Sequence, residues 1–245
     1  MHLPGSHPTY GQDIGILVLD TSFQRIPGDI GNAHSFNYPV KYKVVKSATT
    51  DQIVTKGSKA RALLPLFIKA AQELEREGVR AIVTSCGFLA VIQEELAAAV
   101  SIPVATSSLL LIPMVSNIIG PSKSIGIITA DAGSLSQEHL NGAGIDDKIP
   151  LHIKGMETSK AFSESILKPP TLPTRPLDPI AIEKDLRALS KELQHAHPDI
   201  GAIVLECTNL QPYAKALRTS LNIPVFGIID LVNLIQSGLS TKETS

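Results

Sequence analysis

One stretch of this 245-residue chain occurs twice, and the repeat constrains the fold more than any other feature. The first copy, residues 79–86, reads VRAIVTSC, and the second, residues 200–207, reads IGAIVLEC. Each copy ends at one of the only two cysteines, and the same offset of 121 relates the Ile-Pro-Val runs at 102–104 and 223–225. A register without gaps over this length predicts two similar halves, each with one cysteine at the end of a strand.

The strands predict an α/β fold. The repeated runs are short, apolar and rich in β-branched residues, which is typical of buried parallel strands. A second repeat opens each half at residues 14–20 and 125–131. We therefore expect two pseudo-symmetric Rossmann-like lobes with parallel sheets, formed by residues 12–120 with Cys86 and residues 121–240 with Cys207. Ligands of such sheets bind beyond the carboxyl ends of the strands, so the active site is expected in the cleft between the lobes.

Hydrophobic periodicity assigns the other elements. Strands are expected at 14–19, 40–46, 102–105, 125–130, 149–154 and 223–226, besides the two that end at the cysteines. Helices are expected at 58–77, 88–99, 108–119, 133–141, 180–196, 211–221 and 230–238. Two segments rich in Gly or Pro, 23–39 and 168–180, are expected to be loops that cover the cleft.

Composition excludes several classes of protein. The net charge of −1 disfavours a general nucleic-acid surface or a polybasic membrane surface. No charge occurs between Leu96 and Ser122, but prolines and polar residues interrupt that run. It predicts a buried strand and helix, with the helix at a contact of a homo-oligomer, rather than a membrane span. Two cysteines far apart in sequence form no disulfide framework, and we expect a cytoplasmic protein.

The cysteines are the candidate catalytic residues. Each directly precedes an expected helix, whose N-terminus is predicted to lower the pKa of the thiol toward neutrality. Related by pseudo-symmetry, Cys86 and Cys207 would face each other across the cleft, where one removes a proton and the other delivers one. The alternative is that each is a small buried hydrophobic residue. The matched second copy favours the functional interpretation.

These features resemble the aspartate/glutamate racemase superfamily of cofactor-independent enzymes over nearly the whole chain, from 14–20 to 230–238. The resemblance implies that Cys86 and Cys207 act as acid and base. It also implies substrate contacts from Asp20-Thr21, which closes the first strand, from Thr129, and from Thr208 in the Cys-Thr pair. Neither pyridoxal phosphate nor a metal is expected.

The residues after the cysteines depart from those of glutamate racemases. Gly87 and Phe88 stand where those enzymes carry Asn-Thr, and Asn209 stands where they carry His. The backbone amides at Gly87-Phe88 and Thr208-Asn209 are still expected to hold a carboxylate. These differences favour a substrate other than glutamate.

The function expected from the sequence is a racemase or epimerase that inverts the carbon next to the carboxylate of an amino acid such as aspartate or glutamate. A hydantoin racemase, a maleate-type cis-trans isomerase and a non-catalytic binding protein for small molecules are the alternatives. Arg25 and His34 in the first loop are weaker candidates for contacts with a substrate. The tract from His195 to Asp199 has the residue types of a metal site, but its place at the end of a helix disfavours that interpretation.

Overall fold

The computed structural model of the chain describes residues 7, 9–168 and 176–239. It contains two parallel sheets, each of four strands, and so confirms the predicted α/β class. The first sheet has the order β2-β1-β3-β4 and the second the order β6-β5-β7-β8, so the two halves share one topology. The strands of the first sheet are β1 (Ile14–Leu19), β2 (Val40–Val45), β3 (Ala81–Thr84) and β4 (Val104–Ala105). Those of the second are β5 (Ser124–Thr129), β6 (Leu151–Gly155), β7 (Ile200–Leu205) and β8 (Val225–Phe226).

Burial follows the strand sequences. Every residue of β1, β3 and β5 is buried, as expected for apolar strands in the middle of sheets covered on both faces. β2 pairs only with β1 and is only partly buried along most of its length. Its lysines at 41 and 43 form ion pairs with Glu77, so β2 is a half-exposed edge strand.

The helices of the first half are shorter than predicted. They are α1 (Thr50–Ile53), α2 (Ser58–Ala62), α3 (Leu64–Arg76), α4 (Gln93–Ala98) and α5 (Ile112–Ile119), with 3-10 turns η1 (Ala33–Ser35), η2 (Gly87–Ile92) and η3 (Ser108–Leu111). The helix predicted over 58–77 is broken after Leu63, because Pro65 has no N–H to donate to the preceding turn and instead opens α3. α1 was missed in the sequence because one helical turn gives no periodicity.

The second half repeats this arrangement. Its helices are α6 (Gln137–Gly142), α7 (Lys160–Phe162), α8 (Pro179–Ala196), α9 (Ala214–Leu221) and α10 (Ile228–Leu239), with the π-helical turn η4 (Ser163–Leu167) and the 3-10 turn η5 (Thr208–Tyr213). The segment between β6 and the prolines, to which the sequence assigned no helix or strand, contains α7 and η4. Most of the second predicted covering loop, at 169–175, lies outside the described residues.

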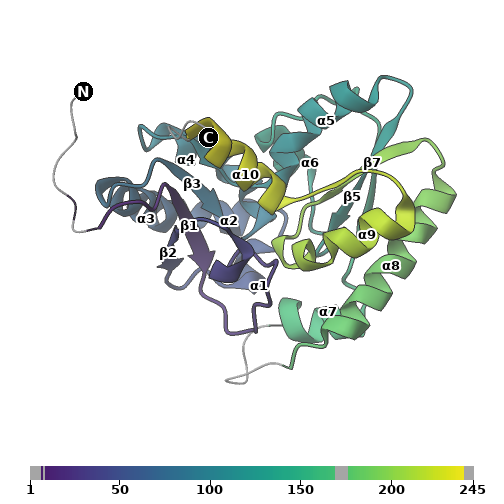
Figure 1. The fold of residues 1–245 in the computed structure, drawn as a ribbon, viewed down its shortest axis with the longest axis horizontal. Coiled ribbons are helices and arrows are strands. Elements are labelled where there is room, and N and C mark those ends of the chain that lie inside the picture. Colours follow the sequence, from purple (N-terminus) through teal and green to yellow (C-terminus); the bar gives the residue numbers. More distant parts are fainter. Residues whose placement is uncertain (1–6, 8, 169–175, 240–245) are drawn as a thin grey trace.

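The two lobes lie side by side, with the carboxyl ends of both sheets directed toward the region between them (Figure 1). α5 follows the first sheet in sequence but packs against β5 and β7 of the second. Met114 and Ile118 of α5 are exposed. The expected contact of this helix with a second copy of the chain stays a prediction. Among the described residues, no helix combines the length and apolar character that crossing a membrane requires.

Candidate active site

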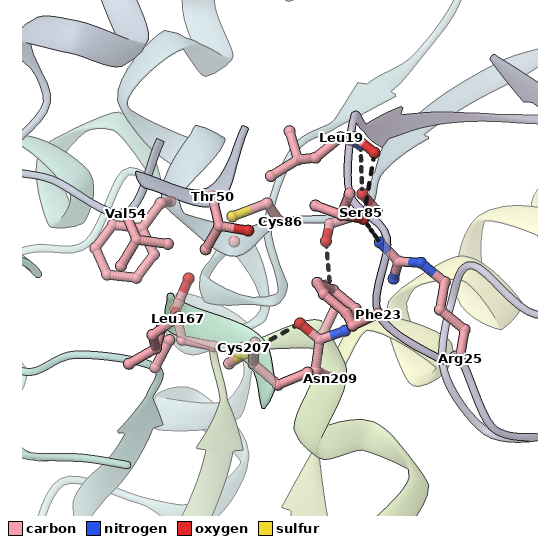
Figure 2. A pocket seen from close by; sticks show the side chains of 17 residues that line it. Leu19, Phe23, Arg25, Thr50, Val54, Ser85, Cys86, Leu167, Cys207 and Asn209 are labelled. Carbon is pink, nitrogen blue, oxygen red and sulfur yellow. Dashed lines mark hydrogen bonds between the residues drawn. The ribbon is translucent and has the colours of Figure 1, made fainter. Parts of the chain in front are cut away.

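Both cysteines line one pocket between the lobes (Figure 2). The space between its lining atoms amounts to about 360 Å³, part of it open to solvent. Its walls are mostly apolar and include Leu19, Phe23, Val54, Phe88, Ile166 and Leu167. A pocket of this size and lining suits a small ligand with few polar groups.

The same local construction places each cysteine. β3 and β7 end two residues before Cys86 and Cys207, and each cysteine is the N-cap of a six-residue 3-10 turn. The Thr208 hydroxyl donates a 2.6 Å hydrogen bond to the carbonyl oxygen of Ser85 and joins the two strand ends across the lobes. Both cysteines are free thiols. The sequence repeat therefore corresponds to one building unit used twice around one pocket.

The expected lowering of the thiol pKa values is wrong. Burial raises the pKa of both cysteines, and the carboxyl of Glu206 raises both further. The N–H groups of Phe88 and Asn209 act in the opposite direction but do not outweigh burial. The short 3-10 turns offer fewer aligned peptide dipoles than the α-helices expected from the sequence.

The two thiols differ in their surroundings. The guanidinium of Arg25 lowers the pKa of Cys86. The pKa of Cys207 has no such neighbour acting on it among the described residues and is raised further by Cys86 and by Asp29. Cys86 also keeps some exposed surface, while Cys207 is buried. Cys86 is therefore the thiol that ionises more easily.

Glu206 is a pocket residue that the sequence analysis missed. Its side chain is fully buried, and its Oε2 accepts a 2.7 Å hydrogen bond from the Thr129 hydroxyl. Burial raises its pKa to about 7, against the opposing effects of Thr129 and the backbone N–H of Ala130. The sequence does mark this residue. A charged glutamate directly follows the apolar strand in the second copy of the repeat, at the position where the first copy has Ser85.

Most of the predicted substrate contacts meet at this pocket. Thr21, Gly87, Phe88, Thr208 and Asn209 all line it. Their suggested roles in binding a substrate remain predictions.

Two predicted contacts lie elsewhere. Asp20 is not among the lining residues, since its Oδ2 accepts a hydrogen bond from the backbone N–H of Ser47 and its Oδ1 lies 3.5 Å from Lys46 Nζ. Thr129 lies behind the pocket wall and contributes through its hydrogen bond to Glu206. The strand ends are thus placed as expected, but these two side chains point to neighbouring groups.

Arg25 joins the first covering loop to both lobes. Its guanidinium binds Asp29 at 2.8 Å and donates to the Thr21 hydroxyl at 3.1 Å. The Asn209 amide donates to the other oxygen of Asp29 at 2.7 Å. Arg25 and Phe23 place this loop at the pocket (Figure 2), whereas His34, the other candidate of the loop, is exposed and does not line it.

The histidine tract lies away from the pocket. The structure adds His152 to it, with the imidazole rings of His152 and His197 stacked at 3.5 Å and Asp199 beside them. One ligand atom from each of the three lies within 4.8 Å of the others. His152 and Asp199 belong to the amino ends of β6 and β7, opposite the sheet edge that carries Cys207.

Known proteins resemble the chain in both fold and sequence. A variant of arylmalonate decarboxylase matches 94% of this chain with a TM-score of 0.64 and 14% identity, and a glutamate racemase from Bacillus anthracis matches 93% with a TM-score of 0.59 and 16% identity. These matches cover 94% and 81% of the two other chains. The fold is that of the aspartate/glutamate racemase superfamily, as predicted. No family model matches the chain.

Sequence comparison adds a narrower family. A dimethylsulfoniopropionate lyase from Durusdinium sp. clade D is 32% identical over 232 residues, which are 92% of this chain and 75% of that protein. The chain belongs to the dimethylsulfoniopropionate lyase family. Dimethylsulfoniopropionate lyase 3 of Emiliania huxleyi is 29% identical over 241 residues, which are 97% of this chain and 61% of that protein. The chain thus spans about three-fifths to three-quarters of the length of these lyase-family relatives.

Proposed function

We propose that the chain is a lyase that cleaves dimethylsulfoniopropionate by β-elimination to dimethyl sulfide and acrylate. The observation that carries the proposal is the pair of thiols in one small, largely apolar pocket of a chain from this family. The apolar walls suit the methyl groups on the sulfonium. The polar groups at the strand ends suit the carboxylate.

The reaction needs one base and no external co-reactant. A thiolate takes the proton from the carbon next to the carboxylate, and the C–H electron pair becomes the second bond of a carbon–carbon double bond. The bond between the next carbon and sulfur breaks, and its electron pair leaves on sulfur as neutral dimethyl sulfide. The thiol then returns its proton to water, which regenerates the base.

The electrostatics of the pocket favour Cys86 as that base. Arg25 lowers the pKa of Cys86, whereas Asp29 raises that of Cys207. The guanidinium therefore stabilises the thiolate in the first lobe while the reaction places further negative charge on the substrate carboxylate. Desolvation of the thiolate by the apolar walls makes it a stronger base once it forms.

The test is release of dimethyl sulfide from dimethylsulfoniopropionate, followed by gas chromatography of the headspace. We expect release by the wild-type protein and a loss of at least ~10²-fold in the Cys86→Ala variant, as is typical for one acid–base group. The Thr219→Ala variant, on the exposed face of α9, is a matched surface control and should keep full activity. Absence of dimethyl sulfide with folded wild-type protein would refute the proposal.

A second candidate follows from the second thiol. Elimination needs one base, yet both lobes deliver a cysteine to the pocket, as inversion at a carbon next to a carboxylate requires. A cofactor-independent racemase of amino acids or hydantoins would exchange the hydrogen on that carbon with solvent. Incubation of a panel of such compounds in heavy water, read by proton NMR and polarimetry, separates the two. Deuterium incorporation with inversion, and no dimethyl sulfide from the sulfonium substrate, would favour the racemase.

A further inference from the structure

Glu206 has a feature that the cysteine chemistry does not explain. One of its two carboxyl oxygens, Oε2, accepts the hydrogen bond from Thr129, while Oε1 is buried and has no partner among the described residues. A buried polar atom without a partner costs about 1–3 kcal/mol, so such atoms are rare in folded proteins. The unpartnered Oε1 of Glu206 therefore indicates a hydrogen-bond partner from outside the chain, such as a ligand.

Gly87 shows where Oε1 lies. A Cβ at position 87 would stand 2.4 Å from Oε1, so this oxygen lies directly beside the Gly87 backbone. Gly87, Glu206 and both cysteines line the same pocket. The unpartnered oxygen is thus buried close to the wall of the pocket that both thiols share.

The proton of a neutral Glu206 belongs on this oxygen. Oε2 already faces the Thr129 hydroxyl, so the free Oε1 is the oxygen that can carry a hydrogen and donate it. Burial favours this neutral form. An acceptor that enters the pocket, such as one oxygen of a ligand carboxylate, would complete the hydrogen bonding of the site.

The charged neighbours favour the same arrangement. The titratable groups around Glu206 are Cys86 of the first lobe and Cys207, the next residue in the chain, with the Arg25–Asp29 pair near them. An ionised Glu206 raises the pKa of both thiols, so its neutral form makes the thiolate easier to form. A neutral acid beside a thiolate also avoids placing two unpaired charges in one small pocket.

We propose that Glu206 is a substrate-binding residue whose protonated Oε1 donates a hydrogen bond to the carboxylate of the ligand, so that a small carboxylate binds together with one proton. This rests on the proposed function only in taking a small carboxylate as the ligand. As the reaction draws negative charge onto that carboxylate, the same hydrogen bond strengthens.

The test measures proton uptake on binding of propionate, which has no leaving group. Isothermal titration in phosphate and in Tris, whose ionisation enthalpies differ, gives the number of protons taken up per ligand. With the pKa of Glu206 at about 7, we expect about 0.9 proton at pH 8 and about 0.1 at pH 6. The affinity of the wild-type protein should weaken about tenfold between these pH values.

Three variants separate this role from a structural one. Glu206→Gln keeps a neutral donor of similar shape, so it should bind propionate with no proton uptake and with constant affinity from pH 6 to 8. Glu206→Met has no donor and should bind at least about tenfold more weakly at pH 6, as expected for the loss of a hydrogen bond to a charged group. Glu164→Gln, at an exposed glutamate of η4, is the matched control and should behave as wild type.

Two outcomes need only the wild-type protein. Absence of proton uptake by the wild-type protein at pH 8, or absence of propionate binding at pH 6, would overturn the proposal. Uptake that persists in Glu206→Gln would assign the proton to another group and overturn it equally. If propionate bound with uptake of a proton but no dimethyl sulfide were released from the sulfonium substrate, the proposed lyase reaction would be refuted. The proposed role of Glu206 would still hold.

Discussion

Replacement of Gly87 by alanine tests the packing that holds Glu206 beside the cysteines. The added Cβ would lie 2.4 Å from both the backbone oxygen and Oε1 of Glu206, where ordinary contacts begin at 3.4 Å. The backbone of β7 or η2 must therefore shift by about 1 Å, and such overpacking costs about 1–3 kcal/mol of stability. We expect a lower midpoint of urea unfolding, followed by far-UV circular dichroism, and loss of most dimethyl sulfide release.

Gly238→Ala provides the control for this substitution. Gly238 lies in α10, and a Cβ added there would have no atom within 4 Å, so alanine should raise the free energy of unfolding by about 0.5–1 kcal/mol through its higher helix propensity. The two substitutions are chemically identical and should change stability in opposite directions. If Gly87→Ala unfolded at the wild-type urea concentration and kept full activity, the contact between Gly87 and Glu206 would not exist in the working protein.

Three further predictions concern the thiols, the Arg25–Asp29 ion pair of the first covering loop and a buried histidine. Iodoacetamide should modify Cys86 before Cys207, and only slowly at pH 7 because burial raises both pKa values; mass spectrometry that found Cys207 modified first would contradict the electrostatic asymmetry. Asp29→Ala should lower the free energy of unfolding by about 3 kcal/mol, since it leaves the largely buried Arg25 without its anion; a loss below about 1 kcal/mol in urea unfolding would refute this. Burial lowers the pKa of His139, so the unfolded chain binds the proton more readily and stability should fall as the pH drops through about 6.5. His139→Gln, which keeps a capping side chain at the start of α6, should reduce that slope, and an unchanged slope would assign it to other groups.

The fold was predictable because its strongest signals are local. Buried strands such as β1 and β7 are continuous apolar runs, and the repeat by itself relates the two halves to each other. Helix interruptions were harder to predict. The break before Pro65 and the 3-10 turns after the cysteines depend on how the chain fits between a strand end and the opposite lobe, which periodicity does not report.

The site was predictable only where sequence adjacency determines position. Gly87, Phe88, Thr208 and Asn209 follow the cysteines and so share their pocket. Thr50, Val54 and Leu167 come from short turns whose approach depends on tertiary packing, and nothing in their own sequence marks them. The thiol pKa values were misjudged because burial is a property of the assembled pocket, not of the strand–turn pattern.

The hydrogen bonds that cross between the lobes determine how a ligand can enter and leave. Besides the bond from Thr208 to Ser85, the Ser108 hydroxyl donates to the carbonyl oxygen of Leu205 at 2.6 Å, so the first half is joined at two points to the end of β7 and the turn that follows it. Rotation of one half against the other would break both bonds. Separation of α1 from η4, which contact each other and bring Val54 and Leu167 to the pocket, would break neither (Figure 2). We therefore expect local opening of these two single-turn segments to govern the residence time of a ligand in the pocket. Loosening that rim would speed entry and escape together, changing the rates of ligand exchange while leaving the equilibrium affinity nearly unchanged.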